Sequence, residues 1–245
     1  MKLIVWNSFG NKWDLFLNQY VNPAIANNPK EIVLGLLVEA GWPPWQQNQE
    51  VRDGHAYCNP NRYGNSDNSF WIPWVKTFSD TKTNSRCSLG GILKHYEYRV
   101  DWFVSNVGAN RPFVRLALEK AGGTSVTVFL VHLTSGATRN TWKELRLLDQ
   151  ISQYIPQGTG AMIVGDINVD LQTTGPLILK NDCWRIVNTG QQTQAKGGEL
   201  DYAFEYRPRQ NFSAQVQILQ QYQTPNGNPP NPSDHSVLQY QVALL

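Results

Sequence analysis

Short polar clusters follow or precede apolar runs at six places along this 245-residue chain, and their residue types suit hydrolytic chemistry. Burying a carboxylate is costly unless it meets a cation or hydrogen-bond donors. Six such clusters in one small chain therefore predict a shared site. The clusters are Trp6-Asn7, Val38-Glu39, Val131-His132, Gly165-Asp166-Ile167-Asn168, Leu200-Asp201-Tyr202 and Ser233-Asp234-His235.

The oxygen-bearing side chains of these clusters suit a hard cation, and no pair of His or Cys residues has the spacing of a zinc site. We expect Mg²⁺, with Mn²⁺ or Ca²⁺ as alternatives. Phosphodiester hydrolysis also needs groups that orient a water and stabilise the leaving oxygen, and two histidines could do this. The candidate metal ligands are Glu39, Asp166, Asn168 and Asp234.

Each cluster alone has an ordinary structural explanation. His132 could be a buried structural histidine, and residues 165–168 could be a turn after a strand. Asp201 could be a surface acid, Asn7 a turn residue, and Asp234-His235 an Asx-type turn. The order and the strand context of the whole set favour the shared site.

The apolar runs predict the elements that would position these groups. A strand at 2–6 precedes a helical pattern over 11–26, which Pro23 and Pro29 are expected to end. A second helix is expected at 138–155. Several strands are too close in sequence for helical crossovers, so we expect mixed sheets covered by helices in an α/β fold. The further strands are predicted at 31–38, 89–93, 98–104, 113–118, 126–132, 161–164, 200–204, 216–219 and 237–244.

Composition sets limits on the class of protein. A hydrophobic fraction of 41% over 245 residues allows a substantial core, and we expect one domain spanning 1–245. The apolar runs are shorter than the roughly 20 residues of a membrane-spanning helix, so stable membrane insertion is not expected. The net charge of only +2 predicts that any polyanion is held by local features.

Two further observations concern processing and redox state. Met1-Lys2 leads directly into the first strand, so we expect no secretory signal: the chain acts where it is made or was trimmed after secretion. Its three cysteines fit no metal-ligand spacing and cannot all pair with one another. A disulfide framework is not expected, although a bridge between Cys58 and Cys87 stays open.

Residues 42–88 predict long surface loops with short strands, because they are rich in polar residues, proline and aromatics without a steady period. Within this region aromatic and cationic side chains alternate, so rings could stack on bases while cations meet phosphates. Alternatively, the rings pack the loops onto the core. The residues concerned are Arg52, Arg62, Tyr63, Phe70, Trp71, Trp74, Lys76, Lys82 and Arg86.

In this order, the six clusters resemble the motifs of the endonuclease/exonuclease/phosphatase superfamily, to which deoxyribonuclease I gives its name, over nearly the whole chain. Within the superfamily the sequence is most similar to the catalytic B subunit of cytolethal distending toxins. Three segments carry that likeness: Asn11-Lys12-Trp13, the Glu-Ala-Gly-Trp-Pro-Pro run at 39–44, and Arg111-Pro112.

The resemblance implies a fold and an activity. The fold is a four-layer α/β/β/α sandwich with two packed mixed β-sheets, whose strand-end loops form a cleft. The activity is that of a Mg²⁺-dependent phosphodiesterase, with DNA as the first choice of substrate and toxin carrier subunits as candidate partners. A phosphoinositide phosphatase is the second hypothesis, and a binding protein that keeps the fold without turnover is the third.

The resemblance also implies roles for the polar clusters. Glu39 would bind the metal, with Asn7, Asp166, Asn168 and Asp234 completing or orienting its shell. His132 and His235 would flank the scissile phosphate. Asp201 would pair with His235 and raise its pKa.

Two parts of the family pattern cannot be assigned fully: the phosphate-binding arginines and the acidic partner of the first histidine. Arg111 and Arg86 would contact phosphate, and Arg115 competes with Arg111 for that position. Deoxyribonuclease I-type enzymes have a glutamate beside the first histidine, and no matching acid lies near residues 89–93. The partner of His132 therefore stays unassigned at this stage.

Overall fold

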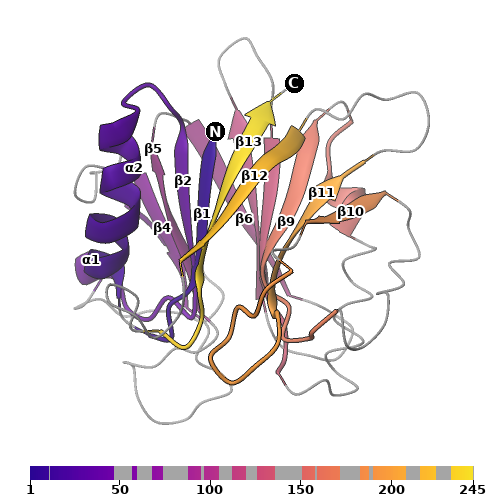
Figure 1. Ribbon diagram of the computed structural model, residues 1–245. Helices are drawn as coiled ribbons and strands as arrows, with labels where there is room; N and C mark the ends of the chain where they lie inside the picture. The colour runs from indigo at the N-terminus through magenta and orange to yellow at the C-terminus, as the bar shows by residue number, and fades with distance from the viewer. Residues whose placement is uncertain are drawn as a thin grey trace.

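Figure 1 shows the computed structural model of the chain, in which a helical segment and two β-sheets surround a common core. The residues that the structure describes are 1–10, 12–46, 57–59, 68–73, 88–94, 97–104, 112–119, 126–135, 151–157, 159–171, 183–187, 190–207, 216–224 and 233–244. Asn11, Arg86 and Arg111 lie outside these ranges. So do residues 138–150 of the second predicted helix and all the cations of residues 52–86.

The first helical segment covers the outer face of one sheet. It consists of the helix α1 (Trp13–Phe16), a π-helical turn (Leu17–Val21) and the helix α2 (Asn22–Asn27). Pro23 does not end the helix as expected but lies in the first turn of α2. The preceding π-helical turn explains this, because a widened turn relieves the contact between the proline ring and the carbonyl before it.

The first sheet has seven strands in the order β12-β13-β1-β2-β5-β4-β3. β1 and β2 are parallel, whereas all other neighbours in this sheet are antiparallel. The strands are β1 (Lys2–Asn7), β2 (Val33–Val38), β3 (Tyr57–Asn59), β4 (Asn68–Ile72), β5 (Leu89–Lys94), β12 (Val216–Thr224) and β13 (Val237–Leu244).

The second sheet has six strands in the order β10-β11-β9-β8-β7-β6. β8 and β9 are its parallel pair, and the other neighbours are antiparallel. The strands are β6 (Glu97–Val104), β7 (Pro112–Glu119), β8 (Val126–His132), β9 (Gly160–Asp166), β10 (Trp184–Val187) and β11 (Asp201–Tyr206).

Alternating side chains of the strands form the core between the two sheets. Leu3, Val5 and Leu36 of the first sheet pack in one buried cluster with Val128 and Val164 of the second. The opposite faces are apolar too, because successive residues of a strand point to opposite sides. This arrangement confirms the predicted α/β sandwich of two packed mixed sheets.

Each outer face has its own cluster. On the first sheet, Ile4 and Trp6 contact Trp13, Phe16 and other residues of the helical segment. On the second sheet, Phe129, Ile163 and Phe204 pack with Ile151 and with the partly buried Tyr154. Tyr154 ends a short 3-10 helix, Ser152–Tyr154, within the range of the second predicted helix.

Two features of the loop region between β2 and β5 correct or narrow the sequence-based expectations. Phe70 and Trp71 are buried, and the Trp71 ring lies 4.9 Å from that of Trp42, so neither can stack on DNA. Instead, they pack β4 onto the core. Cys58 is exposed and forms no disulfide.

Two further expectations concern membrane spans and the number of domains. Among the described residues, no helix combines the length and apolar character that a membrane span needs. The single domain over 1–245 stays a prediction.

Candidate active site

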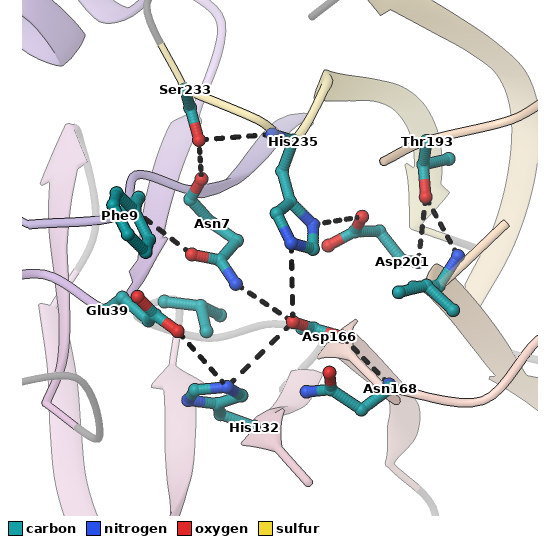
Figure 2. A network of polar contacts seen from close by, with 12 residues as sticks. Asn7, Phe9, Glu39, His132, Asp166, Asn168, Thr193, Asp201, Ser233 and His235 are labelled. Atoms are coloured by element: carbon teal, nitrogen blue, oxygen red, sulfur yellow. Dashed lines mark hydrogen bonds and ion pairs between the residues drawn. The ribbon is translucent and has the colours of Figure 1, made fainter. Parts of the chain in front are cut away.

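The predicted clusters meet at one end of the seam between the sheets, where strand ends from both sheets lie together (Figures 1 and 2). The first sheet contributes Asn7 from β1, Glu39 after β2 and His235 before β13, and the second contributes the ends of β8 and β9 and the start of β11. The contacts that cross the seam include Asn7 Nδ2 to Asp166 Oδ2 at 2.8 Å, Glu39 Oε1 to His132 Nε2 at 3.6 Å, and Asp201 Oδ2 to His235 Nδ1 at 2.9 Å.

Strand register explains why the groups meet. His132 and Asp166 are register partners in the parallel pair β8–β9, and Asp201 is the antiparallel partner of Asp166 in β11. In the other sheet, Asn7 is opposite Val38, which places the next residue, Glu39, at the same edge. Pairing alone therefore brings together residues that are far apart in sequence.

Asp166 lies at the centre of the site, with only 1% of its surface exposed. Its Oδ1 accepts a hydrogen bond from the Asn168 backbone N–H at 2.8 Å, and its Oδ2 accepts the one from Asn7. The same Oδ2 is 3.8 Å from His132 Nε2 and 3.9 Å from His235 Nε2. Burial and the Asp201 charge raise the pKa of Asp166, against the His235 charge and these hydrogen bonds.

The preceding glycine makes this position of Asp166 possible. Gly165 has a φ of 137°, and a Cβ there would lie 2.0 Å from the Val131 carbonyl oxygen. No residue with a side chain fits between β8 and β9 at this point.

His235 and Asp201 form a buried hydrogen-bonded dyad, which is the pairing that the resemblance implied. Burial alone would lower the pKa of His235, but the charge and hydrogen bond of Asp201, with the charges of Asp166 and Asp234, raise it to about 10. His235 therefore carries a proton at neutral pH. Its Nδ1 faces Asp201, and its Nε2 faces Asp166.

Loop residues fix both members of the dyad. Thr193 Oγ1 accepts hydrogen bonds from the backbone N–H groups of Leu200 and Asp201, at 2.8 and 3.1 Å. Ser233 Oγ donates to the Asn7 carbonyl at 2.7 Å and accepts from the His235 N–H at 3.1 Å. No pattern in the sequence predicted a role for Thr193 or Ser233. Each acts on backbone groups, which leave no recognisable side-chain pattern.

Within the part of the chain that the structure describes, three residues other than glycine have left-handed backbone, and all three lie at this site: Phe9, Glu39 and Asn168, with φ of 51°, 52° and 57°. Asparagine tolerates this conformation, whereas the other two residue types adopt it at a cost. Strained backbone of this kind is typical of functional sites. Here it turns the chain immediately after β1, β2 and β9.

Of the remaining predicted residues, two lie at the site, one lies elsewhere, and two are outside the described residues. Asn168 Nδ2 donates to the Leu133 carbonyl at 2.8 Å, so only Oδ1 could be a ligand atom. Asp234 is close enough for its charge to act on His235. Arg115 donates to the Tyr154 carbonyl at 3.2 Å, on the outer face of the second sheet and away from the site. Arg86 and Arg111 lie outside the described residues, so the phosphate-binding arginine stays a prediction.

A cation was also missed. Lys12 Nζ donates to the Ser8 carbonyl at 2.7 Å, and burial lowers its pKa against the charges of Asp234 and Glu39. In the sequence, Lys12 is noted only as part of the resemblance at Asn11-Lys12-Trp13. Its nearness to two acids of the site shows it to be a site cation.

The donor set suits a hard divalent cation. Ligand atoms of Asp166, Asp201 and His235 lie within 4.8 Å of one another. However, Asp201 and His235 already hydrogen-bond each other through these atoms. Glu39 and Asp166 could hold such a cation between them, because both carboxylates approach the same His132 Nε2.

Neither a family model nor a curated protein sequence matches the chain. Solved structures do. CdtB, described as the biologically active subunit of cytolethal distending toxin, is 15% identical with a TM-score of 0.61, over 100% of this chain and 97% of its own. An endonuclease/exonuclease/phosphatase family protein from Leptotrichia buccalis is 12% identical with a TM-score of 0.60, over 100% of both chains.

The chain has the endonuclease/exonuclease/phosphatase fold. A third structure, D. rerio TDP2 complexed with single strand DNA product, is 12% identical with a TM-score of 0.58, over 99% of this chain and 98% of its own. These endonuclease/exonuclease/phosphatase structures confirm the fold that the motif resemblance implied. At such identities they show the fold alone, so the activity must be argued from the site.

Proposed function

We propose that this chain is a divalent-metal-dependent phosphodiesterase that hydrolyses DNA. The observation that carries the proposal is the arrangement around Asp166: one buried carboxylate with a histidine Nε2 on each side and a second carboxylate, Glu39, beside His132. Phosphodiester hydrolysis needs an oriented water, a proton donor and compensation of negative charge. The site offers a group for each.

Glu39 and Asp166 are the residues that would hold the metal. A Mg²⁺ ion, when bound, supplies charge neutralisation to a phosphoryl oxygen. Mn²⁺ and Ca²⁺ have the same preference for oxygen ligands and stay alternatives. Asn7 holds Asp166 through its Nδ2 and thereby fixes the distance between the two carboxylates.

The histidines have different tasks in this proposal. His235 is kept protonated by Asp201, so it donates a hydrogen bond to a phosphate oxygen rather than accepting a proton. His132 Nε2 lies between Glu39 and Asp166 and is placed to assist the leaving group or the attacking water. Glu39 and Asp166 are thereby the acidic neighbours of His132.

DNA is the substrate for two reasons. The D. rerio TDP2 structure of the same fold contains a single strand DNA product. The site also has a nearby cation, Lys12, and a solvent-exposed aromatic ring, Phe9, which suit phosphate and base. Toxin carrier subunits stay a prediction that no described residue tests.

Incubation of the purified protein with supercoiled plasmid and Mg²⁺ tests the proposal. We expect nicked and linear DNA, no cleavage in excess chelator, and recovery when Mg²⁺ or Mn²⁺ is restored. Phosphatidylinositol phosphates form the parallel arm. Phosphate release from these lipids without plasmid cleavage would contradict the DNA assignment, and DNA binding without turnover of either substrate would indicate a binding protein.

A further inference from the structure

Phe9 exposes half of its surface (50%), and its backbone N–H donates to Asn7 Oδ1 of the site (Figure 2). Among the described residues, Phe9 and Leu219 are the only large hydrophobic side chains exposed to this degree. A single exposed apolar side chain is common on protein surfaces and needs no function. The backbone and the surroundings of Phe9, however, distinguish it from such a residue.

The backbone holds Phe9 in place. Its left-handed φ of 51° is unfavourable for a bulky residue, by about 1–2 kcal/mol. Hydrogen bonds on both sides maintain it: the Phe9 N–H donates to Asn7 Oδ1 at 3.2 Å, and the Gly10 N–H donates to the Glu39 carbonyl at 2.9 Å. A third hydrogen bond, from Ser8 Oγ to the Gly10 carbonyl at 3.0 Å, closes the turn.

The same bonds couple the ring to the reacting groups. Asn7 accepts from Phe9 with its Oδ1 and donates to Asp166 with its Nδ2, so one amide side chain sets both positions. Gly10 is bonded to Glu39, the second proposed metal ligand. The backbone that carries the Phe9 ring is therefore held in place relative to the segments that carry the two carboxylates.

A cation accompanies the ring. Lys12 Nζ lies 6.0 Å from the centroid of the Phe9 ring and 5.8 Å from that of Trp6. A flat π face with an ammonium group beside it matches a nucleotide, which combines a flat base with an anionic phosphate. A phosphoinositide headgroup carries phosphates on a saturated ring and has no flat face to stack.

We propose that Phe9 is a stacking platform for a nucleobase of the nucleotide next to the scissile phosphate. The inference rests on the proposed DNA hydrolysis and specifies how that site recognises its substrate. Stacking is tolerant of base identity, because every base has a π face. It therefore positions the strand without selecting a sequence.

Binding of a short single-stranded DNA tests the platform without turnover. The probe has phosphorothioate linkages, which resist hydrolysis, and carries 2-aminopurine, whose fluorescence falls when it stacks. With Mg²⁺ present, we expect the wild-type protein to quench the probe and Phe9→Ala to raise Kd roughly 5- to 100-fold with loss of quenching. Phe9→Tyr keeps the ring and should restore both, whereas Phe9→Leu should restore neither.

Two controls separate stacking from general effects. Leu219→Ala removes the other exposed hydrophobic, on β12, and should leave Kd unchanged. An abasic DNA of the same length should bind equally to the wild-type protein and to Phe9→Ala. Equal losses on abasic and base-bearing DNA, or wild-type binding by Phe9→Leu, would overturn the inference.

Failure of the stacking inference can be distinguished from failure of the proposed DNA hydrolysis. If the wild-type protein cleaves plasmid while Phe9→Ala binds and quenches normally, the stacking inference fails alone. If the wild-type protein quenches the probe in a Phe9-dependent way but cleaves no DNA, the stacking inference stands and hydrolysis fails.

Discussion

At the scale of single residues, the site depends on Asp166 more than on any other side chain. It accepts hydrogen bonds from Asn7 and from the Asn168 backbone, and both histidine Nε2 atoms approach it. Each of these contacts joins segments distant in sequence or adjacent through a strained turn. Burial raises the pKa of Asp166, so its charged form is costly in the folded protein, and changes at Asp166 should affect chemistry far more than folding.

We predict that His132→Ala and Asp166→Ala each reduce DNA hydrolysis by roughly 10²–10⁴-fold, the usual contribution of a general acid–base group. Both variants should keep the wild-type circular dichroism spectrum. Asp14→Asn changes an exposed acid on α1 and is the matched control, with expected activity near wild type. Near-normal activity of either site variant would contradict the assigned roles.

The sequence predicted most site residues because chemistry requires their side chains. Glu39, His132, Asp166, Asp201 and His235 all follow or begin apolar runs, and strand ends converge in such folds. The roles of Thr193, Ser233 and Phe9 could not be predicted, because they depend on which backbone groups and turns lie nearby in space. For Phe70 and Trp71 the sequence left two alternatives open, stacking on bases or packing onto the core, and their burial shows that they pack onto the core.

At the scale of elements, the parallel pair β8–β9 aligns His132 with Asp166 and depends on a glycine for its close approach. The strands themselves were largely predicted from apolar runs. β10 was missed because its four residues, Trp184–Val187, are mostly half-buried and give no clear period. β12 extends to Thr224 rather than Leu219, since its glutamine-rich second half lacks an apolar signal.

Gly165→Ala should destabilise the protein by at least about 2 kcal/mol and lower activity, because its Cβ would meet the Val131 carbonyl. Gly190 is the control, since it also has positive φ, 68°, but no atom lies within 4 Å of an added Cβ. Gly190→Ala should lose only roughly 1 kcal/mol of stability. Urea unfolding of the three proteins measures the difference, and equal losses would refute the close-packing explanation.

A buried carboxylate also joins strands of the two sheets through hydrogen bonds. Glu205 of β11 is fully buried and accepts hydrogen bonds from Arg185 and Arg207, and from the Ile218 N–H of β12 in the other sheet. Burial alone would raise the pKa of Glu205, but these donors outweigh it and lower the pKa below 4.5. The carboxylate therefore stabilises the fold above about pH 4.5, and this contribution disappears as the pH falls through the lowered pKa.

Glu205→Gln should accordingly reduce the free energy of unfolding at neutral pH by about 1–3 kcal/mol. It should also lessen the loss of stability on acidification below about pH 4.5, because glutamine does not titrate. Urea titrations at neutral and acidic pH measure both effects, with Asp14→Asn as the reference. A variant that loses stability on acidification as steeply as the wild-type protein would contradict this role.

At the scale of the whole molecule, the proposed metal ligands belong to different sheets: Glu39 follows β2, and Asp166 ends β9. An ion bound by both would stabilise the folded chain, because ligands that bind only the native state raise its apparent stability. We predict that Mg²⁺ raises the thermal midpoint and that chelator lowers it again. Glu39→Gln should abolish this response, and an unchanged shift in that variant would exclude Glu39 as a ligand.

The contacts that cross the seam have a consequence for partly opened forms of the protein. Neither sheet by itself carries all the polar side chains of the site, because Asn7, Glu39 and His235 come from the first sheet and their partners come from the second. A chain in which the two layers have slipped or separated retains secondary structure but no working centre. If the chain hydrolyses DNA as proposed, it would acquire this activity only when the two sheets dock, and a partly folded chain would leave nucleic acid intact.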